Sequence, residues 1–348
     1  MPARGAKLYR FGALTPPVRD TLARDRRLEK EAVRKVLVVY YSQTGQLRQV
    51  LDACLAPLEG DENIQVDWLR LDPDPAYPFP WTFFRFLDTF PECVQLEPIP
   101  MRPIEVDEGH EYDLVILGYT VWFLSPAPPI TTFLRSPQGR RLLAGRPVVT
   151  LVACRNMWYT AQQTVRRLLV ECGAMLSDHI AFVDRARPMA TFITTPRWML
   201  TGRRDRWLGL PPAGIDDEDI QRRGSRLGRA LRQALTANRM DGQSPVLQGL
   251  EAVRVDEGAI LSERVGYRSF RVWSRLVRAA GPAGSPARRA ALIIYLIFLI
   301  TMIITVVPIS RLVRLAARPL MRQRLERLRL QHEGPSGSGN QRIREFES

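Results

Sequence analysis

The sequence predicts an α/β fold built on a doubly wound parallel sheet, and three observations indicate it. The run VLVVYY after Lys35 and the run from Leu114 to Tyr119 have the apolar composition of strands that are buried on both faces. Segments with the apolar period of helices, such as Gln46 to Leu58, follow such runs along the chain. Strands that alternate with helices form parallel sheets covered by helices on both faces.

The remaining elements continue this alternation. We expect strands over Ile64–Leu71, Pro147–Ala153 and Ile180–Val183, and helices over Thr160–Cys172 and Asp216–Leu235. The last helix begins with Asp216, Asp217 and Glu218, whose charges suit the positive end of a helix dipole. The α/β domain is therefore expected to span residues 35–240.

Two insertions interrupt the alternation, at residues 73–103 and 189–214. Both carry many large apolar side chains, including Trp81 and Phe86 in the first and Trp198 and Trp207 in the second. Such composition is unusual for solvated loops, so the insertions are expected either to cover an apolar site or to pack on the edge of the sheet.

The net charge of +14 lies mostly in the two ends of the chain. Residues 1–34 and residues 311–348 together account for +10, which leaves +4 on the rest of the chain. We therefore predict a basic arm and a basic interfacial tail, and no nucleic-acid partner. The four cysteines are scattered without metal-type or paired spacing, so we expect no metal site and a reducing compartment. The charged first residues show no secretory signal.

An uncharged apolar run over residues 290–310 lies between Arg289 and Arg311. At ~1.5 Å per residue a helix of this length reaches roughly 30 Å, the thickness of a bilayer core. The run therefore predicts a transmembrane or membrane-inserted helix, preceded by a basic amphipathic linker at 241–289. We expect the domain on the cytoplasmic side of the inner membrane, but arginines on both flanks leave the topology of the tail open.

A hydroxyl- and glycine-containing turn follows the first strand and opens a helix. This arrangement directs backbone N–H groups, hydroxyls and the positive end of the helix dipole to one place, as phosphate sites require. The turn resembles the phosphate loop of the flavodoxin family, in which Ser/Thr-x-Thr-Gly-x-Thr follows the first strand. By this resemblance Ser42, Gln43, Thr44, Gly45 and Gln46 would hold the phosphate of FMN, and the sheet would have the order 2-1-3-4-5. Leu47 stands where the family usually has a third hydroxyl.

Two further segments resemble the flavin-ring loops of that family. Thr120, Val121, Trp122 and Phe123 follow the third strand, and Trp122 would be the stacking aromatic. The second segment follows the next strand and comprises Cys154, Arg155, Asn156, Met157 and Trp158. Ligands of such sheets bind at the carboxyl ends of the strands, where these loops lie. Cys154 is either a reactive thiol or a packing residue, and Arg155 is either a cation near the ring or part of a salt bridge.

The whole pattern is similar to the bacterial proteins named dialkylresorcinol condensing enzymes, over nearly all of residues 35–320. The similarity rests on KVLVVYYSQTGQL, YPFPWTFFRFLDTFPE, LVACRNMW, ATFITTPRWMLTG and the apolar helix. It implies an FMN-dependent aromatase that oxidises a dialkylcyclohexanedione to a resorcinol, with an acyl carrier protein and a ketosynthase as partners. The residues favour this redox role over condensation, because the chain lacks a thiolase-type cysteine among histidines. No catalytic base is assigned, and Asp184, Tyr119 and Tyr159 are only candidates.

Three functions therefore remain open. The first is a membrane-associated FMN oxidoreductase acting on a lipid-like ring. The second is an electron-transfer flavoprotein that serves a membrane redox partner, although bulky covers over the flavin argue against it. The third is a cofactor-free lipid-binding scaffold, for which Leu47 is the main support.

Overall fold

The computed structural model describes residues 33–106, 111–242, 244–305 and 322–347, and its centre is a five-stranded parallel sheet. The strands are β1 (Arg34–Tyr40), β2 (Ile64–Arg70), β3 (Leu114–Tyr119), β6 (Pro147–Cys154) and β7 (Met175–Val183). Their spatial order is β2-β1-β3-β6-β7. Counted over these five strands this is the 2-1-3-4-5 order of the flavodoxin-like fold, so the predicted fold class is confirmed.

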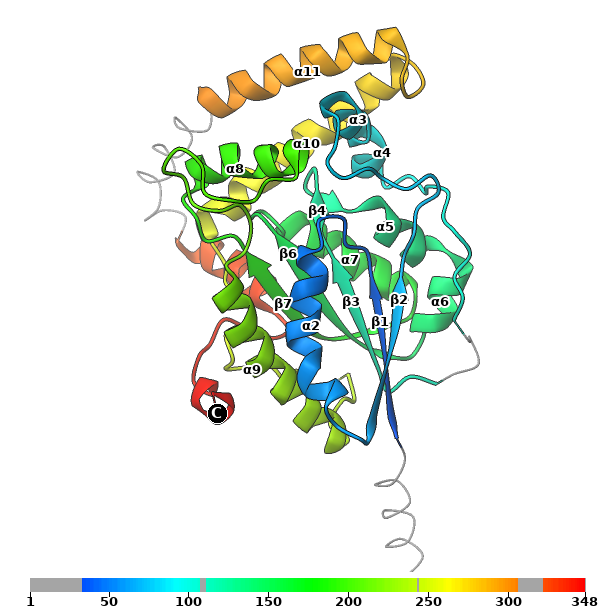
Figure 1. Cartoon of the computed structure of the whole chain (residues 1–348), viewed down its shortest axis with the longest axis vertical. Helices are drawn as coiled ribbons and strands as arrows, with labels where there is room; N and C mark the ends of the chain where they lie inside the picture. The colour runs from blue at the N-terminus through cyan, green and yellow to red at the C-terminus, as the bar shows by residue number, and fades with distance from the viewer. Residues whose placement is uncertain (1–32, 107–110, 243, 306–321, 348) are drawn as a thin grey trace, which may run out of the picture. The chain divides into compact units, whose positions relative to one another are not determined.

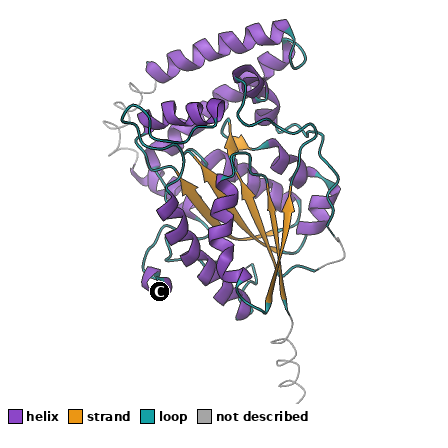
Figure 2. Cartoon of the chain, viewed as in Figure 1, coloured by secondary structure: helices purple, strands orange, loops and turns teal. Residues whose placement is uncertain are grey.

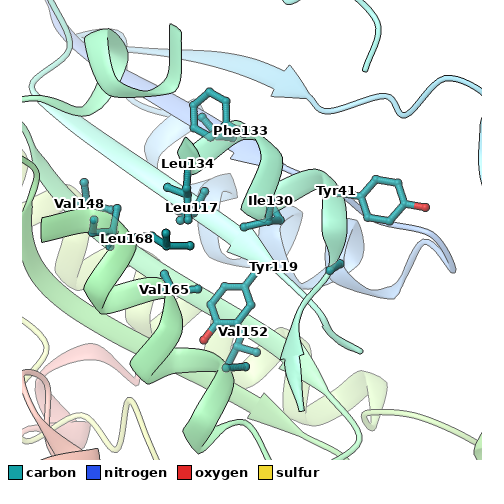
Figure 3. Close-up of a cluster of buried hydrophobic side chains, with 14 of the residues drawn as sticks. Tyr41, Leu117, Tyr119, Ile130, Phe133, Leu134, Val148, Val152, Val165 and Leu168 are labelled. Carbon is teal, nitrogen blue, oxygen red and sulfur yellow. The ribbon is translucent and has the colours of Figure 1, made fainter. Parts of the chain in front are cut away.

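Helices cover both faces of the sheet (Figures 1 and 2). One face carries α2 (Gln46–Glu59) and α9 (Asp217–Thr236), and the other carries α5 (Pro128–Arg135), α6 (Pro137–Leu143) and α7 (Tyr159–Glu171). Each face has its own apolar core. Figure 3 shows the core under α5 and α7, where Leu117 and Val148 of the sheet meet Ile130 and Leu168.

The last strand is longer than its sequence indicates, because it begins at Met175 rather than at Ile180. Its first half contains Ser177, Asp178 and His179, which are polar and yet fully buried. Asp178 accepts hydrogen bonds from Val246 N and Leu247 N, and Thr150 Oγ1 contacts His179 Nδ1 at 2.9 Å. Partners elsewhere in the chain satisfy Asp178 and one ring nitrogen of His179, whereas Ser177 Oγ and His179 Nε2 have no partner among the described residues. Local hydropathy therefore does not reveal this half of the strand.

Both insertions contain helices, at the end of the sheet where the strands terminate (Figure 1). The first insertion forms α3 (Phe83–Asp88) and α4 (Phe90–Gln95), and the second forms α8 (Pro188–Thr201). The insertions contact each other, since Trp81 N donates to Met199 O at 2.8 Å and the rings of Phe79 and Trp198 meet at 6.4 Å. They therefore form one cover over the carboxyl ends of the strands.

The segment expected as a linker contains the long helix α10 (Glu257–Ala279). The helix α11 (Pro286–Ile304) begins just before the apolar run and includes its residues 290–304. Among the described residues, α11 is the one helix long and apolar enough to cross a membrane. Residues 306–310 of the apolar run, residues 311–321 of the predicted tail and nearly all of the predicted basic arm lie outside the described residues.

The described part of the tail differs from an interfacial segment, because it packs on the α/β domain. It forms a helix over residues 322–333 and the short helix η1 (Ile343–Phe346). Leu328 joins the core under α7, and Phe346 joins the core under α9. Apolar residues that are widely spaced in a basic segment thus find partners on the domain itself.

Candidate functional site

The turn between β1 and α2 has the geometry of an anion site. Gly45 is the N-cap of α2 with a left-handed backbone (φ 83°), and the first turn of α2 has no acidic residue. Ser42 Oγ accepts from Arg48 N at 3.3 Å, and Thr44 Oγ1 accepts from Gln46 N at 3.4 Å. Each hydroxyl therefore uses a lone pair within the turn and keeps its O–H free to donate to an anion.

The two glutamines of the turn bind the cover instead. Gln43 Nε2 donates to Pro78 O at 3.0 Å, in the first insertion. Gln46 exchanges two hydrogen bonds of 3.2 Å with the backbone of Ile215, just beyond the second insertion. Leu47 is 1% exposed and belongs to the core under α2, so its side chain offers no hydrogen bond to a phosphate.

The first predicted ring loop is a tight hairpin of β4 (Val121–Trp122) and β5 (Ser125–Pro126). Its turn residues Phe123 and Leu124 have positive φ values of 48° and 61°. Such a backbone is costly for side chains of this size, and it recurs at functional sites.

Trp122 lies among aromatic rings of the first insertion. Its ring centroid is 5.2 Å from that of Tyr77, 5.7 Å from Trp81 and 6.1 Å from Phe86, and only 6% of the residue is exposed. Phe123 stacks on Phe86 at 4.9 Å. The cover thus encloses the predicted stacking aromatic rather than leaving it open to solvent.

The residues of the second predicted ring loop do not all lie in the same surroundings. Arg155 faces α8, where its guanidinium donates to Thr191 Oγ1 at 3.1 Å and lies 4.3 Å from the ring centre of Phe192. Met157 has φ 57°, and its N–H donates to Asn156 Oδ1 at 2.7 Å. Trp158 is 1% exposed and packs on His179 in the core, so it does not join the other loop residues.

The surroundings of Cys154 favour a packing residue over a reactive thiol. Burial raises the pKa of its thiol, and this outweighs the opposing effect of the Arg155 cation. The thiol therefore stays protonated, which is unfavourable for a nucleophile.

Two of the three candidate bases face away from the loops. Tyr119 donates to Gln162 Oε1 at 2.6 Å within the core shown in Figure 3, and burial raises the pKa of its hydroxyl. Tyr159 accepts from Asp256 N at 2.7 Å, and burial likewise raises its pKa.

Asp184 follows β7 and accepts from Ala186 N and Gly214 N, and burial raises the pKa of its carboxyl. It borders a hollow of about 470 Å³ that also includes Ile215, the partner of Gln46.

A fourth candidate base, Glu263 of α10, was not predicted from the sequence. Its side chain is fully buried, and Oε1 lies 2.5 Å from both Thr160 N and Thr160 Oγ1. Among the described residues its Oε2 has no hydrogen-bond partner. Burial raises the pKa of Glu263 to about 7. Because Thr160 also donates to Leu124 O at 2.9 Å, Glu263 is linked to the first ring loop.

Some of the buried side-chain polar atoms without a hydrogen-bond partner lie at the same end of the sheet, while others, such as Ser177 Oγ and Arg226 Nε, lie elsewhere in the described chain. Within the described part of the chain, these atoms include Gln43 Oε1, Thr120 Oγ1, Trp81 Nε1 and Thr194 Oγ1. They come from the phosphate-type turn, the first ring loop and the two insertions. Buried polar atoms normally have partners, so these four atoms are candidates for contact with a polar ligand. The edge of a flavin ring carries both donors and acceptors, which are the groups that such atoms need.

The comparisons with known proteins assign no family to the chain. No protein-family model matches the chain, and no curated protein matches it. Among solved structures, a putative flavoprotein from Bacteroides eggerthii is 18% identical, with 42% of this chain and 87% of that chain covered and a TM-score of 0.34. A flavoprotein in complex with FMN from Lactobacillus acidophilus is 15% identical, with 42% and 93% covered and a TM-score of 0.33.

A flavodoxin from the domain Archaea is 14% identical, with 58% of this chain and 98% of that chain covered and a TM-score of 0.32. Similarity at this level carries no argument about activity. The fold assignment depends on the strand order described above.

Proposed function

We propose that the chain binds FMN at the carboxyl ends of β1, β3 and β6 and acts as a membrane-associated flavin-dependent oxidoreductase. The observation that carries this proposal is the set of unpartnered buried polar atoms shared by the phosphate-type turn, the first ring loop and the cover. The positive φ values of Phe123, Leu124 and Met157 in the two ring loops add independent support.

Different residues of the chain would bind the phosphate, contact the flavin ring and take up a proton. Ser42, Thr44 and the start of α2 would bind the phosphate, and Gln43 would face the ring with its free Oε1. Bound FMN would supply a hydride acceptor for removing two hydrogens from a substrate ring. Arg155 offers a cation that favours an enolate-type oxygen, and Asp184 and Glu263 are the carboxyls near the loops that can take up a proton.

We propose an apolar cyclic diketone as the substrate, as in the aromatase reaction that the resemblance to dialkylresorcinol condensing enzymes implies. The cover favours such a substrate over a protein redox partner. Its rings enclose Trp122, whereas an electron carrier needs an accessible flavin edge. An acyl carrier protein and a ketosynthase as partners follow from that resemblance alone.

Titrating the purified full-length chain with FMN and following the flavin absorbance tests the proposal. The parent protein should bind FMN, and the double variant Ser42→Ala/Thr44→Val should bind it about 10- to 100-fold more weakly, because each hydroxyl donates to a charged group. Thr236→Val, which removes an exposed hydroxyl at the far end of α9, is the matched control. A parent protein that binds no flavin, or a double variant that binds as tightly as the control, contradicts the proposal.

A further inference from the structure

Helix α11 is joined to the first insertion by charged and aromatic contacts. Arg288 is buried and donates to Asp88 Oδ1 at 2.6 Å and to Glu92 Oε2 at 2.5 Å. Two turns further along, Tyr295 stacks on Phe90 with ring centroids 4.4 Å apart and an interplanar angle of 9°. These contacts extend over several turns, so α11 lies along the domain rather than pointing away from it (Figure 1).

The chain on both sides of α11 packs on the same domain. After α11, Ser336 Oγ donates to Asp178 Oδ1 at 2.7 Å and accepts from His179 N at 2.7 Å. Glu251 N donates to Gly339 O, and Arg342 N donates to Gly249 O at 2.9 Å. A helix that crosses a bilayer once places its two flanks on opposite sides, and this packing places them on one side.

A return crossing between α11 and the tail is also disfavoured by the sequence. The segment 306–321 contains Arg311, Arg314 and Arg318, whereas a crossing helix needs about 20 predominantly apolar residues. The packing of both flanks and the sequence of this segment therefore argue against α11 as a spanning helix.

The face of α11 that turns away from the domain is apolar and exposed. It consists of Ile293, Ile294, Ile297, Ile300 and Ile304, each between 41% and 68% exposed. Other large exposed apolar residues come from helices and a loop at the same end of the molecule (Figure 1). They are Phe83 and Phe84 of α3, Phe192 and Ile193 of α8, Trp207 and Leu208 of the following loop, and Val272 and Leu276 of α10. We call this set together with the five isoleucines the apolar platform.

Arginines accompany the apolar platform. Arg268, Arg271 and Arg275 are exposed on α10, beside Val272 and Leu276. Near the start of α11, Arg85, Asp88 and Arg289 line a hollow of about 290 Å³, and the carboxylate of Asp88 is paired with Arg288. Apolar side chains with arginines around them match a leaflet with anionic headgroups.

We propose that α11 lies in the plane of an anionic membrane leaflet and that the apolar platform holds the carboxyl end of the sheet against the lipid. The protein is then attached to one leaflet and does not span the membrane. This orientation also lets a lipid-dissolved ring reach the cover directly from the leaflet. Only this access of a substrate depends on the proposed function.

Labelling with a membrane-impermeant maleimide in intact spheroplasts and in inverted vesicles tests the topology. Glu62→Cys precedes α11 and Gln341→Cys follows it, and both positions are exposed. The parent, with its native cysteines, sets the background. Both cysteines should react in inverted vesicles and neither in spheroplasts. Reaction of the two cysteines from opposite sides overturns the proposal.

Flotation with lipid vesicles tests the docking face. The purified full-length chain should bind phosphatidylglycerol vesicles at least about tenfold more tightly than phosphatidylcholine vesicles. Ile297→Ser/Ile300→Ser should weaken binding about tenfold or more, whereas Val170→Ser, which changes an exposed residue on α7, should not. Equal binding by the double variant and the parent, or equal binding to both lipids, contradicts the proposal. Neither assay needs flavin, so failure of FMN binding alone would contradict the proposed function and leave the membrane orientation standing.

Discussion

The hydroxyl of Thr160 lies between two acceptors. Thr160 Oγ1 is 2.9 Å from Leu124 O and 2.5 Å from Glu263 Oε1. Its single hydrogen can be shared between them in a three-centre bond, or Glu263 can donate to Thr160 Oγ1 when the carboxyl is protonated. With a pKa of about 7, Glu263 exists in both protonation states near neutral pH. Thr160 thus connects a titratable carboxyl to the first ring loop.

The raised pKa of Glu263 predicts a pH dependence of stability. Between the ordinary glutamate pKa of 4.5 and the folded value of about 7, the unfolded chain has lost a proton that the folded chain retains. The free energy of unfolding should therefore fall as the pH rises through this window, by up to about 3 kcal/mol from this group.

Urea unfolding at pH 5 and at pH 8 measures this effect. Glu263→Gln should remove most of the difference between the two pH values. Glu257→Gln changes a partly exposed residue of the same helix and should leave the difference unchanged. A variant at 263 with the same pH dependence as the parent would show that this carboxyl is not the source.

At the scale of elements, the contact of α2 with α9 depends on glycine. A Cβ added at Gly228 would lie 2.0 Å from Cys54 O, and one added at Gly224 would lie 2.7 Å from Ala53 Cβ. Alanine is favoured over glycine within a helix by about 1 kcal/mol, but the overlap at position 228 can be relieved only by moving the two helices apart.

We therefore predict that Gly228→Ala destabilises the protein by about 2 kcal/mol, measured by chemical denaturation. The matched control is Gly266→Ala in α10, where the added Cβ would be 3.4 Å from the flexible Leu124 side chain. The control should be neutral or stabilising by up to about 1 kcal/mol. Equal stability of the two variants would mean that the close approach of α2 and α9 is not required.

The attachment of α11 depends on Arg288. Its side chain is 3% exposed, whereas the side chains of Asp88 and Glu92 are 22% and 31% exposed. Because the two carboxylates keep some contact with water, Arg288→Ala should cost about 2 kcal/mol, less than the loss of a fully buried pair.

Hydrogen exchange measured by mass spectrometry should show this loss as faster exchange in α3, α4 and the first turns of α11, with the sheet unchanged. Arg289→Ala removes the adjacent arginine, which is exposed and lies 5.4 Å from the ring centre of Phe84, and should have little effect. Unchanged exchange in α11 after Arg288→Ala would contradict the proposed attachment.

At the scale of the whole molecule, local patterns predicted the sheet and long-range contacts determined the rest. The strand Leu114–Tyr119 agrees residue for residue with β3, because a continuous apolar run records burial on both faces. The start of β7 was missed, since the polar residues Asp178 and His179 make hydrogen bonds with residues 150, 246, 247 and 336. No local signal in the sequence reports partners that far away.

The candidate site likewise contains residues that local sequence patterns predict and residues that only long-range contacts reveal. The turn at Ser42–Gly45 could be located because its residues are contiguous in the chain, and the loops after β3 and β6 could be located through their positions after strands. Their role in binding FMN stays a prediction. Glu263 could not be located, because it lies 103 residues beyond its partner Thr160 in a helix rich in arginine. The tail was expected at a membrane surface, and its packing on β7 depends on Ser336, which has no apolar signal.

The most direct test of the account is anaerobic reduction of the FMN-loaded protein by a dialkylcyclohexanedione, without any protein partner and with anionic vesicles present. Loss of the oxidised-flavin absorbance, with formation of one equivalent of resorcinol per flavin, is the predicted result. Flavin that is bound but stays oxidised in the presence of this diketone, and is reduced only by a protein electron donor, would contradict the proposed oxidoreductase and favour an electron carrier.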